Sequence, residues 1–214
     1  MKEDYYKIQE ILLKLFDMQQ HLVHTHQLPD DYYRLFSVFN PIQNQDQIIN
    51  LMNVKVGTHT NFLESTDFLY LPPLTQDPKT IPILSLKCDL GESPSNVTFY
   101  IVVFRYPDNG KEQPCYLGFR FEGPEGCDED SSCHNYWHVQ IVKEFKGRHS
   151  DKFPKYHDWL PIKMPCIPIR AECPVSLLVC LLFSFYGNRL FDEINIPLKS
   201  DYKRPLDGIL CFCK

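Results

Sequence analysis

The sequence has little of what marks a secreted, membrane-spanning or nucleic-acid-binding protein. Glycine is scarce, with 9 residues against 17 prolines, which predicts rigid connections rather than tight glycine turns. No apolar run approaches the roughly 20 residues that cross a bilayer, and the first residues predict a helix rather than a secretion signal. The net charge of −5 does not indicate a nucleic-acid surface, although nucleic acid remains a possible partner. We therefore expect a cytoplasmic protein without membrane contact and with mostly free thiols.

Established catalytic motifs are also missing from the chain. It contains no Gly-rich phosphate loop, no serine in an elbow turn, no two-histidine helix of the metalloprotease type and no dinucleotide-binding fingerprint. A small domain without such a motif is more often a binding, adaptor or regulatory subunit than an enzyme. We therefore expect no cofactor, and we expect another protein as the partner.

What the chain does contain is the composition of a folded domain. It is 43% hydrophobic and 23% charged, and 214 residues are enough to bury a core without disulfides. We predict a single α+β domain over residues 1–214. Its parts are a helical and extended N-terminal part (1–80), an antiparallel sheet (81–145), and an irregular segment followed by a buried helix and a tail (146–214).

The N-terminal part has a helical period. Apolar residues recur at three- and four-residue steps between Tyr5 and Val23, with charged residues between them, which predicts an amphipathic helix. Short helices are expected over residues 31–36 and after Asp46, which is expected to cap the second of them. Residues 54–80 show no period and contain several prolines, so we expect an extended crossing segment there.

The period changes to that of β-strands in the middle of the chain. Segments rich in β-branched and aromatic residues cover residues 83–90, 97–106, 116–122 and 134–142. Asp108, Asn109 and Gly110 lie between the second and third segments and suit a hairpin turn, so these two strands should be antiparallel. The simplest arrangement is an antiparallel meander of at least four strands.

A late helix is predicted over residues 175–186. Pro174 stands at its first turn and Gly187 follows its last, which is the usual punctuation of a helix. Because the segment is apolar on nearly every side, we expect it to be buried all round against the inner face of the sheet.

Alternation along the strands separates an apolar face from a polar-aromatic face. On the second strand, Thr98 and Tyr100 share one side. The candidate binding residues on the polar-aromatic face are Lys87, Arg120, His134, Tyr136, His138 and Gln140. We predict a non-enzymatic interaction or adaptor protein, a subunit of a larger assembly, that binds through this face.

The same face supplies an alternative function. His138 as a general base, with Arg120, Glu122 and Tyr136 around it and Gln140 as an orienting amide, would suit a metal-independent phosphodiesterase or nuclease. This grouping depends on the register of two strands, since a shift of one residue moves a side chain to the opposite face.

Cys127, Cys133, His134 and His138 are the candidate ligands if a metal is bound. Their spacing matches none of the paired-cysteine patterns of structural zinc. Two histidines four residues apart on a strand lie roughly 13 Å apart, which is too far to share one ion. We therefore expect no structural metal, and no tightly bound zinc in the purified, reduced protein.

A further alternative comes from the order of the elements. A helix, a meander, an irregular stretch with Trp159 and Pro161, and an apolar helix together resemble the ubiquitin-conjugating fold, which implies a cysteine transferase. In that family the nucleophilic cysteine precedes the tryptophan–proline element. Here no cysteine lies between His134 and Trp159, and the family's His-Pro-Asn element is missing, so no catalytic residue carries over. The later cysteines are expected to be small buried hydrophobic residues: Cys166, Cys173 and Cys180.

Overall fold

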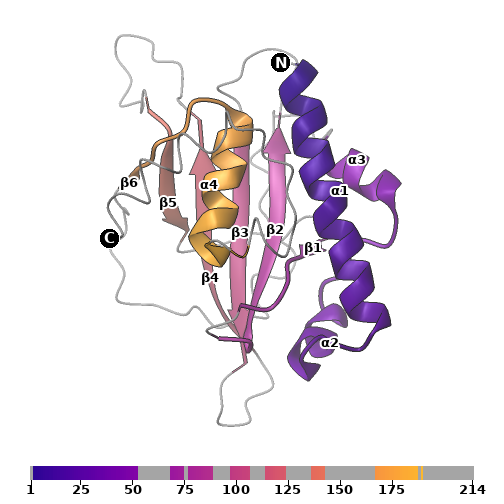
Figure 1. Ribbon diagram of the computed structural model, residues 1–214. Coiled ribbons are helices and arrows are strands. Elements are labelled where there is room, and N and C mark those ends of the chain that lie inside the picture. The colour runs from indigo at the N-terminus through magenta and orange to yellow at the C-terminus, as the bar shows by residue number, and fades with distance from the viewer. Residues whose placement is uncertain are drawn as a thin grey trace.

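The computed structural model describes residues 2–52, 68–74, 77–88, 97–106, 114–123, 136–142, 167–187 and 189. Its helices are α1 (Lys2–His24), α2 (Asp30–Phe36), α3 (Gln45–Met52) and α4 (Pro174–Tyr186). Its strands are β1 (Leu69–Tyr70), β2 (Thr80–Cys88), β3 (Val97–Arg105), β4 (Cys115–Glu122), β5 (His138–Val142) and β6 (Ile167–Pro168). The predicted α+β class is confirmed: an N-terminal helix, an antiparallel sheet and a C-terminal helix that packs on the sheet (Figure 1).

The six strands follow one another across the sheet in sequence order, from β1 to β6, and every neighbouring pair is antiparallel. The predicted pairing of the second and third strand segments, here β3 and β4, is therefore confirmed. The turn residues 108–110 on which that prediction rested lie outside the described residues.

Two hydrophobic clusters lie on opposite faces of the sheet, because neighbouring residues of a strand point to opposite sides. The first joins α1, α3 and α4 to strand residues that include Leu84, Leu86, Phe99, Ile101 and Phe121. The second joins α2 and the turn after it to the other side of the central strands, at Ile81, Ile83, Val102, Phe104 and Tyr116. Figure 1 shows α4 lying across the first face with α1 beside it.

Helix α4 confirms the predicted late helix and its punctuation. Cys173 caps its first turn: its sulfur accepts from the Ser176 N–H, while the Ser176 hydroxyl accepts from the Cys173 N–H. Gly187 closes the helix with a φ of 54°, the left-handed conformation that favours glycine, and donates its N–H to the Phe183 carbonyl. Every residue from Pro174 through Leu182 is buried, but Ser184 in the last turn is exposed. The expectation that the helix is buried on every side is therefore correct for only part of its length.

Two boundaries differ from expectation. Asn44, not Asp46, caps α3: its side-chain oxygen accepts from the Gln47 N–H, and the Gln47 side chain accepts from the Asn44 N–H in return. Asp46 instead lies inside the first turn, where a negative charge suits the helix dipole. The last predicted strand begins at His138, because Tyr136 lies in a bend before it.

The residues expected to form an extended crossing segment contain an additional short strand, β1. Gln19, a side chain of α1 that is only 2% exposed, links the outer edge of β1 to the chain after α2. The Gln19 amide donates to the Ile42 carbonyl at 2.9 Å, and its oxygen accepts from the Tyr70 N–H at 2.9 Å. Gln19 therefore gives hydrogen-bond partners to two main-chain groups that have no partner on a neighbouring strand.

Replacing Gln19 by alanine should lower the free energy of unfolding by about 2 kcal/mol, because the buried Tyr70 N–H loses its acceptor. The matched control is Gln20→Ala. Gln20 also donates to the Ile42 carbonyl, at 3.1 Å, but that oxygen keeps Gln19 when Gln20 is removed. Chemical denaturation should show a clearly smaller loss for the control. Equal losses would contradict the assigned role of Gln19.

None of the helices in the described ranges is long and apolar enough to cross a membrane.

Candidate functional site

The strand register brings the predicted polar residues of β4 and β5 together in pairs. Arg120 lies opposite Gln140, and Glu122 lies opposite His138. On the other side of β4, Tyr100 and Thr98 of β3 lie opposite Arg120 and Glu122. These side chains share the face of the sheet that α4 does not cover.

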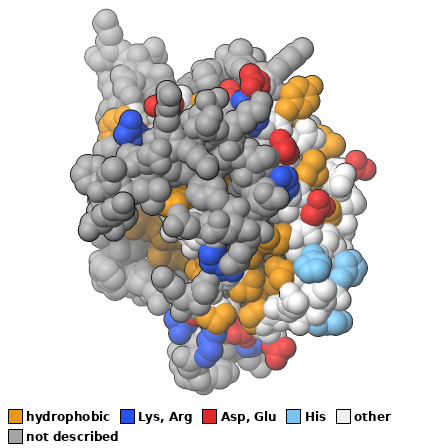
Figure 2. All heavy atoms as spheres, in the orientation of Figure 1, with side chains coloured by type: hydrophobic (Ala, Val, Ile, Leu, Met, Phe, Trp, Pro, Cys, Tyr) orange, Lys and Arg blue, Asp and Glu red, His pale blue; other side chains and the backbone are white. Residues whose placement is uncertain are grey.

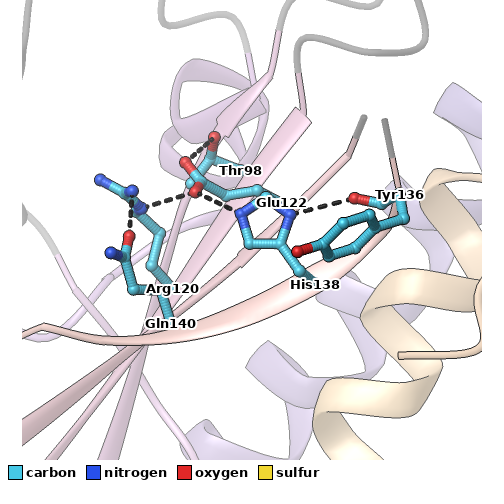
Figure 3. Close-up of polar contacts among 6 residues, drawn as sticks. All are labelled: Thr98, Arg120, Glu122, Tyr136, His138 and Gln140. Carbon is cyan, nitrogen blue, oxygen red and sulfur yellow. Dashed lines mark hydrogen bonds and ion pairs between the residues drawn. The ribbon is translucent and has the colours of Figure 1, made fainter. Parts of the chain in front are cut away.

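Glu122 is the centre of the contacts on this face (Figure 3). Its Oε2 lies 2.8 Å from Nε of Arg120 and 3.3 Å from Nε2 of His138. Its Oε1 accepts a long hydrogen bond of 3.5 Å from the Thr98 hydroxyl. Arg120 also donates through Nη2 to the Gln140 side-chain oxygen. We call Arg120, Glu122, His138 and Gln140 the polar network.

The Arg120–Glu122 contact is an ion pair rather than a well-aligned hydrogen bond. Although Nε and Oε2 are 2.8 Å apart, neither atom has a partner that meets the angular requirement of a hydrogen bond. An ion pair with imperfect alignment repays less of the cost of removing its charges from water. Glu122 is only 12% exposed, whereas Arg120 is 34% exposed and is still partly solvated.

His138 is held on both sides and is 1% exposed. Its Nδ1 lies 3.0 Å from the Tyr136 carbonyl, and since a carbonyl oxygen only accepts, Nδ1 carries a proton and donates it. Its Nε2 lies 3.3 Å from Oε2 of Glu122, a close contact that is not a hydrogen bond, because Oε2 has no hydrogen-bond partner. Neither ring nitrogen therefore points a lone pair toward solvent in this conformation.

Tyr100 lies beside the polar network. Burial raises the pKa of its phenol, and the positive charge and hydrogen bond of Arg120 oppose that rise. The phenol therefore remains neutral at physiological pH. Alternation predicts that Thr98 and Tyr100 share one side of their strand, and the β3–β4 register shows that this side faces Glu122 and Arg120.

Tyr136 lies at the rim of this face, just before β5. It is 39% exposed, and its ring meets the His138 ring edge to face with centroids 5.7 Å apart. The aromatic contact orients Tyr136 against a buried neighbour while part of its ring stays in solvent.

Several predicted site residues cannot be placed in this arrangement. His134, Cys127 and Cys133 lie outside the described residues, and of Lys87 only the main chain is described, opposite Thr98. Among the residues that the structure describes, no group of three His, Cys, Asp or Glu side chains could hold a metal ion.

Among the cysteines whose side chains the structure describes, Cys115, Cys173 and Cys180 are free thiols. Cys180 is buried in α4, and its thiol donates to the Arg170 carbonyl at 3.3 Å. Burial, with a smaller contribution from the neighbouring Cys173, raises the pKa of the Cys180 thiol to about 11. Cys180 therefore fits the expected small buried hydrophobic residue. Cys173 is half-buried and caps the helix instead, and Cys166 lies outside the described residues.

Cys180 should resist alkylation in the native protein. At about pH 8, a thiol whose pKa is about 11 is ionised in only about one molecule in a thousand, and the thiolate is the reactive form. Cys115, which is half-buried at the start of β4, serves as the internal control. Mass spectrometry of native protein treated with iodoacetamide should find Cys115 modified well before Cys180. Equal rates would contradict the burial of the thiol.

Comparison with known proteins adds no information about the site: no family model, no curated protein and no solved structure matches the chain.

Proposed function

We propose that this protein is a non-enzymatic interaction protein, an adaptor or a subunit of a larger assembly, that binds another protein through the sheet face carrying the polar network. A cytoplasmic location is part of the proposal. The free thiols of Cys115, Cys173 and Cys180 support it, because a reducing compartment keeps thiols unpaired.

The observation that carries the proposal is the engagement of both ring nitrogens of His138 in a buried position. Close polar contacts hold the side chains of this network against one another and hold His138 against the Tyr136 carbonyl. Tyr136 and Arg120 are among the residues of this face that remain partly exposed. Tyrosine and arginine are among the residue types that contribute most to binding at protein interfaces.

The enzymatic alternatives find less support in this geometry. A general base needs a nitrogen within hydrogen-bond reach of the substrate, whereas His138 gives Nδ1 to a main-chain carbonyl and Nε2 to Glu122. A phosphodiesterase would therefore need this face to rearrange before reaction. For the cysteine transferase, the raised pKa of Cys180 counts against that thiol as a nucleophile.

Site-specific photocrosslinking tests the proposal in cells of the protein's own source. A photoreactive phenylalanine derivative placed at Tyr136 should give a discrete crosslinked product with another protein. The matched control carries the same derivative at Tyr6, a tyrosine of α1 that is 64% exposed. Accessibility alone would give more product at Tyr6 than at Tyr136.

Crosslinking confined to position 136 would support a binding face there, and loss of the product on Arg120→Ala would locate the partner on the polar network. Comparable products at both positions, or none at Tyr136, would overturn the proposal. Phosphodiester hydrolysis by the purified protein that disappears in His138→Ala would overturn it in favour of the enzyme.

A further inference from the structure

Arg120 differs from two other arginines of the protein in how it meets its carboxylate. Arg34 and Arg105 each donate a hydrogen bond of 3.0 Å to the carboxylate that pairs with them. At Arg120, Nε lies 2.8 Å from Oε2 of Glu122, but neither atom has a hydrogen-bond partner. The guanidinium of Arg120 therefore lies beside a negative charge without a hydrogen bond to it at Nε.

The hydrogen-bond donors of Arg120 outnumber the acceptors around it. A guanidinium has five N–H donors. Nη2 donates to the Gln140 side-chain oxygen, one donor serves the Tyr100 phenol, and Nε faces Glu122. Five donors less these three leave two that meet no acceptor among the residues that the structure describes.

The positive charge of the polar network is also its more exposed charge. Arg120 is 34% exposed, whereas Glu122 is 12% exposed. Figure 3 shows Arg120 toward one end of the network and Tyr136 at the other, with Glu122 and His138 between them. A partner on this face therefore meets the guanidinium more directly than the carboxylate.

The charges of α1, which packs with α4 on the other face of the sheet, are balanced locally instead. Basic and acidic side chains alternate along this helix (Figure 2), and Lys7 lies 2.5 Å from Glu3. Pairs of this kind leave little net charge at any one place on the helix, so α1 does not favour a partner of either sign.

We propose that the partner protein presents an acidic side chain, Asp or Glu, to Arg120. This inference rests on the proposed function, because it specifies the chemistry of the partner at the same face. A planar guanidinium matches a carboxylate through two parallel N–H···O bonds, and two donors of Arg120 are left to make them. The hydrogen bond to Gln140 restrains the guanidinium before the partner arrives, so less side-chain freedom is lost on binding.

Charge-changing variants of the full-length protein test this inference, with the photoreactive derivative at Tyr136 as the probe of binding. Each variant is titrated into lysate of the protein's own source, and the concentration that gives half-maximal crosslinking is measured. Arg120→Gln should raise this concentration roughly tenfold or more, because a charged hydrogen bond to the partner is lost. Arg120→Lys keeps the charge without the planar fork, so its value should lie between. Arg34→Gln is the matched control and should change nothing, since Arg34 has its own hydrogen-bonded carboxylate.

Glu122→Gln separates contact with the partner from a structural role of the ion pair. It keeps the shape of the side chain but removes the negative charge beside Arg120, so an acidic partner should bind more tightly and the half-maximal concentration should fall. A pair that matters only for structure would make Arg120→Gln and Glu122→Gln weaken binding together.

Weakening by both variants, or no effect of Arg120→Gln, would overturn the acidic partner group while the product at Tyr136 still supported the proposed function. Tighter binding of Arg120→Gln would overturn it in favour of a basic group on the partner. Absence of any product at Tyr136 would overturn the proposed function, and this inference with it.

Discussion

Replacing Glu122 by alanine is expected to lower the free energy of unfolding by about 3 kcal/mol. The substitution leaves Arg120 and His138 facing each other across the sheet with no carboxylate between them. Removing one partner of a buried ion pair costs about 3–5 kcal/mol. We place the effect at the low end, because Arg120 is 34% exposed and its contact with Glu122 is poorly aligned.

Thermal denaturation should show this loss as a fall in Tm of about 6–12 °C, from about 2–4 °C per kcal/mol for a chain of this length. Glu10→Ala is the control, since Glu10 is an exposed glutamate of α1 and should change stability by less than about 0.5 kcal/mol. A loss for Glu122→Ala no larger than that of the control would mean that the polar network is not a stabilising unit.

Replacing Leu178 by alanine is expected to destabilise the protein by about 3 kcal/mol as well, through a cavity rather than through charge. Leu178 is 0% exposed in the core cluster that α4 forms with α1 and the sheet. Leucine-to-alanine substitutions at such positions cost about 2–5 kcal/mol. Leu177 is equally buried on an adjacent side of the helix, so Leu177→Ala should cost a similar amount.

The matched control is Ser184→Ala, which changes an exposed position in the last turn of the same helix. Its hydroxyl donates to the Cys180 carbonyl, which already belongs to the helix, so the expected change is within about 0.5 kcal/mol. If Leu177→Ala or Leu178→Ala behaved like Ser184→Ala in chemical denaturation, α4 would not be buried on both sides.

The period of the sequence was enough to predict the sheet and its late helix. The alternation of Leu117, Phe119 and Phe121 predicts that Arg120 and Glu122 lie on the opposite face, and in β4 these two residues pair with Gln140 and His138 on that face. Pro174 and Gly187 located the ends of α4 because each suits one backbone conformation. These features are local, so no knowledge of the fold was needed to predict them.

What depends on distant contacts could not be predicted in the same way. Strand β1 is two residues long and gives no period, and Gln19 holds its edge from 51 residues away in sequence. Alternation predicts that His138 lies on the polar-aromatic face, but it does not predict how deeply the side chain is buried there. In the structure His138 is buried between Glu122 and the Tyr136 carbonyl. Burial of this kind follows from the packing of several segments together.

Chemical modification of histidine tests the central claim, that His138 is closed off rather than poised as a base. Diethyl pyrocarbonate acylates accessible, unprotonated imidazole nitrogens, and mass spectrometry identifies each modified peptide. In the native protein His21, which is exposed, should be modified while His138 is not, and denaturation should make both reactive. Modification of native His138 at a rate similar to that of His21 would contradict the account, because it would show a base that a substrate can reach.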